Sequence, residues 1–119
     1  MAKVYQDKIL LGDKLIGEID EQGKVYSIEG HKSVYVGWID YEQRDVYRKD
    51  EVLIGWAEED GKILAYNEAE DEEEEIGYIN EDGELFFYDK NEEDVYFGKL
   101  KEWEAYAEGA AALLFFTEC

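Results

Sequence analysis

The sequence predicts an all-β protein of one domain, residues 1–119, built as a ring or barrel-like array of four to five β-hairpin repeats. A short C-terminal apolar helix or tail is expected to complete it. A pattern of glycine, apolar residues and an acidic turn recurs along the chain, which indicates a repeat architecture. Aromatic residues make up 15% of the 119 residues, which excludes a disordered chain. The length fits one domain of roughly 100–200 residues.

Four segments carry the repeat. Each begins with glycine, passes an acidic turn and ends in two apolar or aromatic residues: GEIDEQGKVY (17–26), GWIDYEQRDVY (37–47), GWAEEDGKIL (55–64) and GYINEDGELF (77–86). Turns with an acidic residue or Asn early and Gly last are typical of a type I turn followed by a left-handed glycine, so each unit is expected to be a hairpin. The second segment lacks the turn glycine, and its turn at residues 43–45 is expected to differ.

The two ends of the chain supply the halves of a further unit. Val4 and Tyr5 match the end of a repeat, and residues 98–100 match the beginning of one. Pairing these halves would complete a fifth hairpin, close the ring and remove its edge strands. The leading glycine lies inside a strand, where glycine normally weakens the structure, so we expect it to permit a bend or a close backbone approach. Strand alternation would place the residues before and after it on one face.

The last segment, residues 101–119, differs from the repeats. It is rich in alanine, and four of its residues recur at helical spacing: Trp103, Tyr106, Ala107 and Ala110. We expect it to be a cap, a packed tail or short helix that plugs the array of hairpins. The alternative is a contact between subunits of a homo-oligomer, because an exposed apolar run requires a partner. That contact would use Leu113, Leu114, Phe115 and Phe116.

The GxIDxxGxVY pattern of the units and the AEGAAALLFF tail resemble those of the small bacterial four-fold beta flower proteins. The GWI and GYI segments are more loosely similar to WG-type repeats. The resemblance covers residues 4–116 or thereabouts. It implies hairpins arranged like petals around a pseudo-symmetry axis, and it implies no reaction, cofactor or catalytic residue.

Residue sets for catalysis or metal binding are scarce. His31 is the only histidine and Cys119 the only cysteine, which is too few for a usual zinc site. No nucleophile elbow and no phosphate-binding glycine loop occurs. With 32 acidic residues, some pair of carboxylates will meet the spacing of a glycosidase by chance. We therefore expect no enzyme, no metal and no cofactor.

The negative charge is concentrated in one part of the chain. The net charge is −20, and residues 58–94 contain 17 acidic and two basic residues. This balance argues against direct binding to nucleic acid or to anionic membranes. The densest run is expected to be a solvated loop between the third and fourth hairpins. Alternatives are a surface that imitates nucleic acid toward a basic protein, weak Ca²⁺ binding and solubility alone. The run comprises Glu70, Asp71, Glu72, Glu73, Glu74 and Glu75.

Three aromatic residues, Trp38, Trp56 and Tyr78, hold the same position in successive units. Such a set most simply forms core, because aromatic side chains bury large areas. The alternative is an aromatic-lined pocket at the axis for a sugar, a base or a cation. Glu18 and Lys99 hold the same register in the other units, which indicates that the ring of side chains is not uniformly apolar.

These patterns predict a non-catalytic small binding or interaction module, for an unknown small ligand or protein. The alternative is an acidic, nucleic-acid-mimicking inhibitor or regulator of a basic protein. The longest apolar run, residues 110–116, is too short to span a bilayer. Charges interrupt the N-terminal segment, so we expect that it is not a signal peptide. We expect a cytoplasmic protein.

Overall fold

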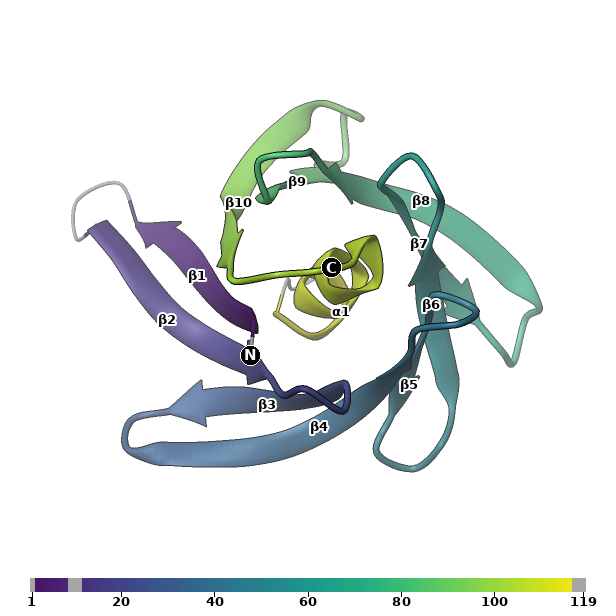
Figure 1. Cartoon of the computed structure of the whole chain (residues 1–119). Helices are drawn as coiled ribbons and strands as arrows, with labels where there is room; N and C mark the ends of the chain where they lie inside the picture. The colour runs from purple at the N-terminus through teal and green to yellow at the C-terminus, as the bar shows by residue number, and fades with distance from the viewer. Residues whose placement is uncertain (1, 9–11, 117–119) are drawn as a thin grey trace.

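The structure is a computed structural model that describes residues 2–8 and 12–116, with side chains described for all of these except residues 7, 8, 12 and 13. Within these residues, ten antiparallel strands close into a barrel around one helix (Figure 1). The predicted all-β, barrel-like array of hairpins with a short C-terminal helix is confirmed. The elements are β1 (Ala2–Lys8), β2 (Gly12–Ile19), β3 (Lys24–Glu29), β4 (Lys32–Asp40), β5 (Asp45–Arg48), β6 (Leu53–Ala57), β7 (Lys62–Asn67), β8 (Glu72–Ile79), β9 (Glu84–Tyr88), β10 (Asp94–Lys101) and α1 (Tyr106–Phe116).

The four predicted repeats are the hairpins β2–β3, β4–β5, β6–β7 and β8–β9. In three of them the turn glycine has a positive φ, at Gly23, Gly61 and Gly83. In the second unit Arg44 adopts this left-handed conformation instead, with φ of 61°. The different turn predicted at residues 43–45 is therefore confirmed. Asn and Gly tolerate such a φ better than Arg.

The fifth unit is assembled from the two ends of the chain. β10 pairs with β1, and Leu100 lies opposite Val4. Ile19 and Val25 of the first unit form the equivalent pair. Because β1 also pairs with β2, each strand has two neighbours and the barrel has no free edge. The predicted closure by the two terminal half-units is confirmed.

A β-bulge precedes every leading glycine. The register shifts at the same place in five strand pairs, with one extra residue on the glycine-bearing strand. A bulge bends its strand and raises its twist, which provides the predicted bend. The extra residue packs against the core instead of continuing the alternation. The prediction that the residues before and after each glycine share one face is therefore wrong. The extra residues are Ile16, Val36, Ile54, Ile76 and Phe97.

The helix α1 lies inside the barrel and packs against the leading glycines (Figure 1). A Cβ built on Gly77 would lie 2.9 Å from Leu113 Cδ1, and one on Gly55 would lie 2.6 Å from Leu114 Cδ1. Gly37 faces Phe115 and Gly17 faces Phe116 in the same way. Four successive helix residues thus each contact the glycine of one unit, and glycine is required because any Cβ would occupy their space.

The rest of the interior is a ring of inward side chains around the alanine-rich first half of the helix. Each unit contributes two residues to this ring. The first lies two positions after the leading glycine, and the second lies opposite the first on the paired strand. Ala107, Ala110, Ala111 and Ala112 are fully buried. Small side chains let the helix axis approach the strands closely. The strand residues are Val4, Ile19, Val25, Ile39, Val46, Ala57, Ile63, Ile79, Leu85 and Leu100.

Candidate functional site

The three repeated aromatic residues lie on the outer wall of the barrel. Trp38, Trp56 and Tyr78 each follow a leading glycine that faces α1, so strand alternation points them outward. All three are half-buried. The sequence allowed a pocket at the barrel axis lined by these rings, but α1 occupies the axis (Figure 1). The structure does not gather these three rings at the axis.

Each of these rings pairs with an aromatic ring on a neighbouring strand instead. Trp38 stacks on Tyr47 with centroids 4.3 Å apart and planes inclined by 12°. Trp56 meets Tyr66 at 5.7 Å. Cross-strand aromatic pairs of this kind stabilise a sheet. Each of these two pairs therefore stabilises its own hairpin. A binding surface would require a larger group of rings than one pair.

A larger group of four aromatic rings lies on strands β8, β9 and β10. Phe86 stacks on Tyr78 with centroids 4.9 Å apart and also contacts Tyr96 at 5.5 Å. Tyr88 lies 6.1 Å from Tyr78. We call Tyr78, Phe86, Tyr88 and Tyr96 the aromatic ladder. Sequence reasoning singled out Tyr78 alone. The alternation in the segments ELFFY and DVYF could have indicated the other three, once they were placed on adjacent strands.

The acidic run is placed beside this ladder. Glu70 and Asp71 lie in the turn between β7 and β8, whereas Glu72 to Glu75 belong to β8 and pair with β7 residues 64–67. The prediction of a loop is therefore wrong for these four residues, because the turn is short and both strands continue beyond the barrel interior. All six acidic residues are exposed, as predicted. None of them forms an ion pair within the part of the chain that the structure describes.

Two carboxylates are bound directly to the ladder. The Tyr78 hydroxyl donates a hydrogen bond to Asp94 Oδ2 at 2.7 Å. The Tyr88 hydroxyl donates one to Glu75 Oε2, also at 2.7 Å. We call the aromatic ladder together with Glu75 and Asp94 the acidic aromatic wall. The tyrosines hold both carboxylates in fixed positions beside the rings.

The electrostatics of the wall follow from these bonds. The hydrogen bond to Asp94 raises the pKa of Tyr78, since it stabilises the neutral phenol beside a negative charge. Burial and then the hydrogen bond to Glu75 raise the pKa of Tyr88. The hydrogen bond to Asp71 raises the pKa of Tyr66 on β7 in the same way. The phenols of Tyr66, Tyr78 and Tyr88 therefore stay neutral at neutral pH.

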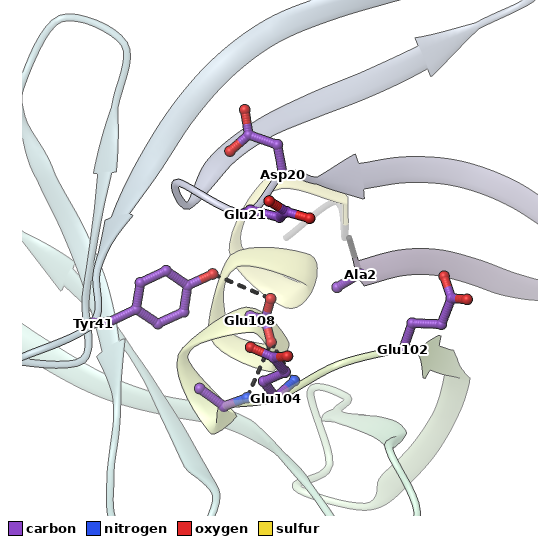
Figure 2. A pocket seen from close by; sticks show the side chains of 8 residues that line it. Ala2, Asp20, Glu21, Tyr41, Glu102, Glu104 and Glu108 are labelled. Carbon is purple, nitrogen blue, oxygen red and sulfur yellow. Dashed lines mark hydrogen bonds between the residues drawn. The ribbon is translucent and has the colours of Figure 1, made fainter.

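A cavity of about 540 Å³ lies at one mouth of the barrel, where α1 begins. Asp20, Glu21, Glu102, Glu104 and Glu108 contribute carboxylates to its lining (Figure 2). They come from the β2–β3 turn, from the segment before α1 and from α1 itself. Within the described residues, no group of acidic, histidine or cysteine side chains is arranged to hold a metal ion.

Glu108 is buried in this cavity, with 4% of its surface exposed. Its Oε1 accepts hydrogen bonds from the backbone N–H groups of Glu104 at 2.6 Å and Ala105 at 3.0 Å. A glutamate at the third helical position that reaches back in this way caps the helix N-terminus. Its Oε2 accepts a hydrogen bond from the Tyr41 hydroxyl at 3.1 Å (Figure 2). Burial, followed by the charge of Glu108, raises the pKa of Tyr41.

Glu108 and Tyr41 therefore fix α1 in the barrel, and neither residue stood out in the sequence. The one available signal was an acidic side chain inside an otherwise apolar helix. The buried carboxylate accepts three hydrogen bonds from its own chain, which gives the acidic residue at this end of the barrel a structural explanation. Of the remaining reactive groups, His31 is exposed in the turn between β3 and β4, and Cys119 lies outside the described residues.

The apolar tail residues offered as a subunit contact are placed by the helix. Leu113 is fully buried, and Leu114, Phe115 and Phe116 are half-buried against the leading glycines of their own barrel. Their packing inside one chain accounts for their apolar character. A homo-oligomer through these residues stays a prediction.

Comparison with known proteins adds no assignment. No family model, no curated protein and no solved structure matches the chain. The resemblance to the four-fold beta flower family therefore stays an expectation. The helix that the structure describes is too short to cross a lipid bilayer.

Proposed function

We propose that the protein is a non-catalytic interaction module that binds a positively charged protein partner through the acidic aromatic wall. The observation that carries the proposal is the pair of hydrogen bonds that fix Asp94 and Glu75 beside the ladder. Rings supply apolar contact area, and fixed carboxylates supply charge without a further loss of side-chain freedom.

The surrounding charge supports the same partner. Residues 58–94 contribute 17 acidic and two basic residues, and they form β7, β8 and β9 with the turns between them. Two of these carboxylates are already paired, Glu59 with Arg44 and Asp60 with Lys62, each at 3.6 Å. The run Glu70–Glu75 keeps its charge available. Such a field accelerates encounter with a cationic protein and makes the association sensitive to salt.

Mimicry of nucleic acid is a narrower form of this function. It requires that the partner normally binds DNA or RNA through the same basic surface. Competition distinguishes the two forms: duplex DNA displaces this protein from its partner if the surface is shared. A partner that duplex DNA leaves bound supports the general interaction module without mimicry.

The test begins with affinity capture from lysate at 50 and 500 mM salt, and continues with titration of each purified partner. The test variant neutralises the acidic run by Glu70→Gln, Glu72→Gln, Glu73→Gln, Glu74→Gln and Glu75→Gln. The control variant removes the same amount of charge from the first half of the chain by Glu18→Gln, Glu21→Gln, Glu29→Gln, Glu42→Gln and Glu51→Gln.

We expect the test variant to bind a purified partner about tenfold more weakly at low salt, which corresponds to about 1.4 kcal/mol. The control variant should lose much less, because its charges lie on β2, on β3 and in turns outside residues 58–94, and charges are screened over about 10 Å at 0.1 M salt. The proposal is wrong if every captured partner binds both variants as tightly as the unmodified protein.

A further inference from the structure

We infer that the acidic aromatic wall recognises arginine in preference to lysine, so that its partner presents an arginine-rich segment. This inference rests on the proposed function and names the chemistry of the partner. It depends on two features that occur together on the wall: rings at stacking distance and carboxylates with a free oxygen beside them.

The rings form a continuous surface across three strands. Phe86 is central, because it contacts Tyr78 on β8 and Tyr96 on β10. Tyr96 is 37% exposed, and the other three rings are half-buried. A planar guanidinium group stacks on aromatic rings and is weakly hydrated, whereas an ammonium group is compact and strongly hydrated. The surface therefore favours arginine.

The carboxylates add the second contact. Asp94 Oδ2 accepts a hydrogen bond from the Tyr78 hydroxyl, and Glu75 Oε2 accepts one from the Tyr88 hydroxyl. Among the residues that the structure describes, the other oxygen of each carboxylate accepts no hydrogen bond. Arginine presents five donors in a rigid plane, so one side chain can stack on a ring and donate to the neighbouring carboxylate. The ammonium group of lysine has no planar face, so it cannot stack on a ring while it donates to the carboxylate.

The outer wall already attracts a cation elsewhere. The Lys101 Nζ of β10 lies 4.9 Å from the centroid of the Tyr5 ring on β1. That pair is internal to the chain and lies outside the ladder. It is one instance in this chain of a positive charge over an aromatic ring.

Charge argues against two other occupants of this surface, a second copy of the chain and nucleic acid. A second copy of this chain carries the same net charge of −20, so the acidic walls of two copies repel one another. Nucleic acid is repelled for the same reason. An arginine-rich segment of another protein is the occupant that complements both the charge and the rings.

The chain offers a matched control surface. Tyr26 and Tyr35 also form an outward aromatic pair, with centroids 5.8 Å apart, on strands β3 and β4. No hydrogen bond joins either hydroxyl to a carboxylate among the described residues. Replacing a ring there tests the loss of an aromatic side chain without touching the acidic aromatic wall.

The experiment measures fluorescence anisotropy with two labelled nonapeptides, GRGRGRGRG and GKGKGKGKG, which carry the same charge. We expect the arginine peptide to bind about tenfold more tightly at 0.3 M salt, where simple attraction between charges is weakened. Phe86→Leu should reduce this preference to about twofold or less. Tyr35→Leu should leave the preference unchanged.

A second variant covers the case in which Phe86→Leu fails to fold. Asp94→Asn with Glu75→Gln changes only exposed side chains and should weaken binding of the arginine peptide more than that of the lysine peptide. Thermal unfolding verifies the fold of each variant.

Each outcome decides a separate question. Equal affinities for the two peptides would overturn the inference and leave the proposed function standing. A preference for arginine that persists in both wall variants would also overturn it, because recognition would lie elsewhere. Binding of neither peptide at 50 mM salt would overturn the proposed function together with the inference.

Discussion

Replacing the leading glycine of the third unit, Gly55→Ala, should destabilise the protein. In an ordinary strand alanine is the better residue by roughly 0.5–1 kcal/mol, because glycine loses more backbone freedom on folding. Here the new Cβ would lie 2.6 Å from Leu114 Cδ1 on α1 and would overlap the Leu64 carbonyl oxygen of β7. Leu114 can move, but the carbonyl belongs to the barrel wall. The steric term therefore decides the sign.

The expected magnitude follows from the cost of overpacking a core, about 1–3 kcal/mol. For a domain of this size about 1 kcal/mol lowers the melting temperature by roughly 4 °C, so we expect a decrease of about 4–12 °C. Thermal and urea unfolding, followed by tryptophan fluorescence and circular dichroism, measure the change. Gly30→Ala is the control for substitution in open space, since no atom of the described residues lies within 4 Å of its Cβ position. Its φ of 62° adds a backbone cost of its own.

A double-mutant cycle separates the two contacts. If Leu114 contributes to the clash, Leu114→Ala should cost less in the Gly55→Ala background than in the unmodified protein, by at least about 0.5 kcal/mol. A Gly55→Ala protein that is as stable as the unmodified protein, or more stable, would show that α1 does not pack on the glycines as described.

Two further predictions concern the attachment of α1. Glu108→Ala should lower the free energy of unfolding by about 1–3 kcal/mol, because two backbone donors and the Tyr41 hydroxyl lose a charged acceptor in a partly buried place; urea unfolding would contradict this if the midpoint did not move. Because the pKa of Tyr41 is raised in the folded protein, its contribution to stability is present below the ordinary tyrosine pKa of about 10 and decreases as the pH rises above it. Tyr41→Phe should therefore reduce the loss of stability between pH 9 and 11, as measured by urea unfolding across that range; an unchanged slope would refute the assignment.

The sequence predicted the features that recur with a fixed spacing. Leading glycines about 20 residues apart located the hairpins, and the half-units at Val4 and Gly98 indicated how the barrel closes. The altered turn was visible because the second unit lacks its turn glycine. Each of these conclusions depends on residues that lie close together along the chain or that repeat one another, so that one sequence contains the comparison needed.

The sequence could not predict features that depend on the pairing of distant strands. The bulge residue Ile54 looks like any apolar strand residue until Leu53 is seen opposite Tyr47 and Gly55 opposite Val46. Similarly, Glu72 to Glu75 appear as a charged loop because their repulsion is a local property, whereas their pairing with β7 depends on how far that strand extends. The role of Glu108 depends on Tyr41, which is 67 residues away.

The aromatic pairs of the second and third units have a structural explanation that requires no binding role. A glycine layer admits α1, but it removes the side chains that would otherwise cover the strands at that level. Cross-strand rings on the outer wall compensate for this loss. Trp38 with Tyr47, and Trp56 with Tyr66, are explained in this way.

The fourth unit exceeds that requirement. One ring pair, Tyr78 with Phe86, would suffice beside Gly77, yet Tyr88 and Tyr96 extend the surface onto β9 and β10. The hydroxyls of Tyr78 and Tyr88 donate hydrogen bonds to Asp94 and Glu75. These two carboxylates lie outside the barrel and do not stabilise its interior. Loss of Trp38 should therefore affect stability without affecting binding of an arginine peptide, whereas loss of Tyr88 should affect binding more than stability. That contrast distinguishes a ring that supports the barrel from a ring that recognises a partner.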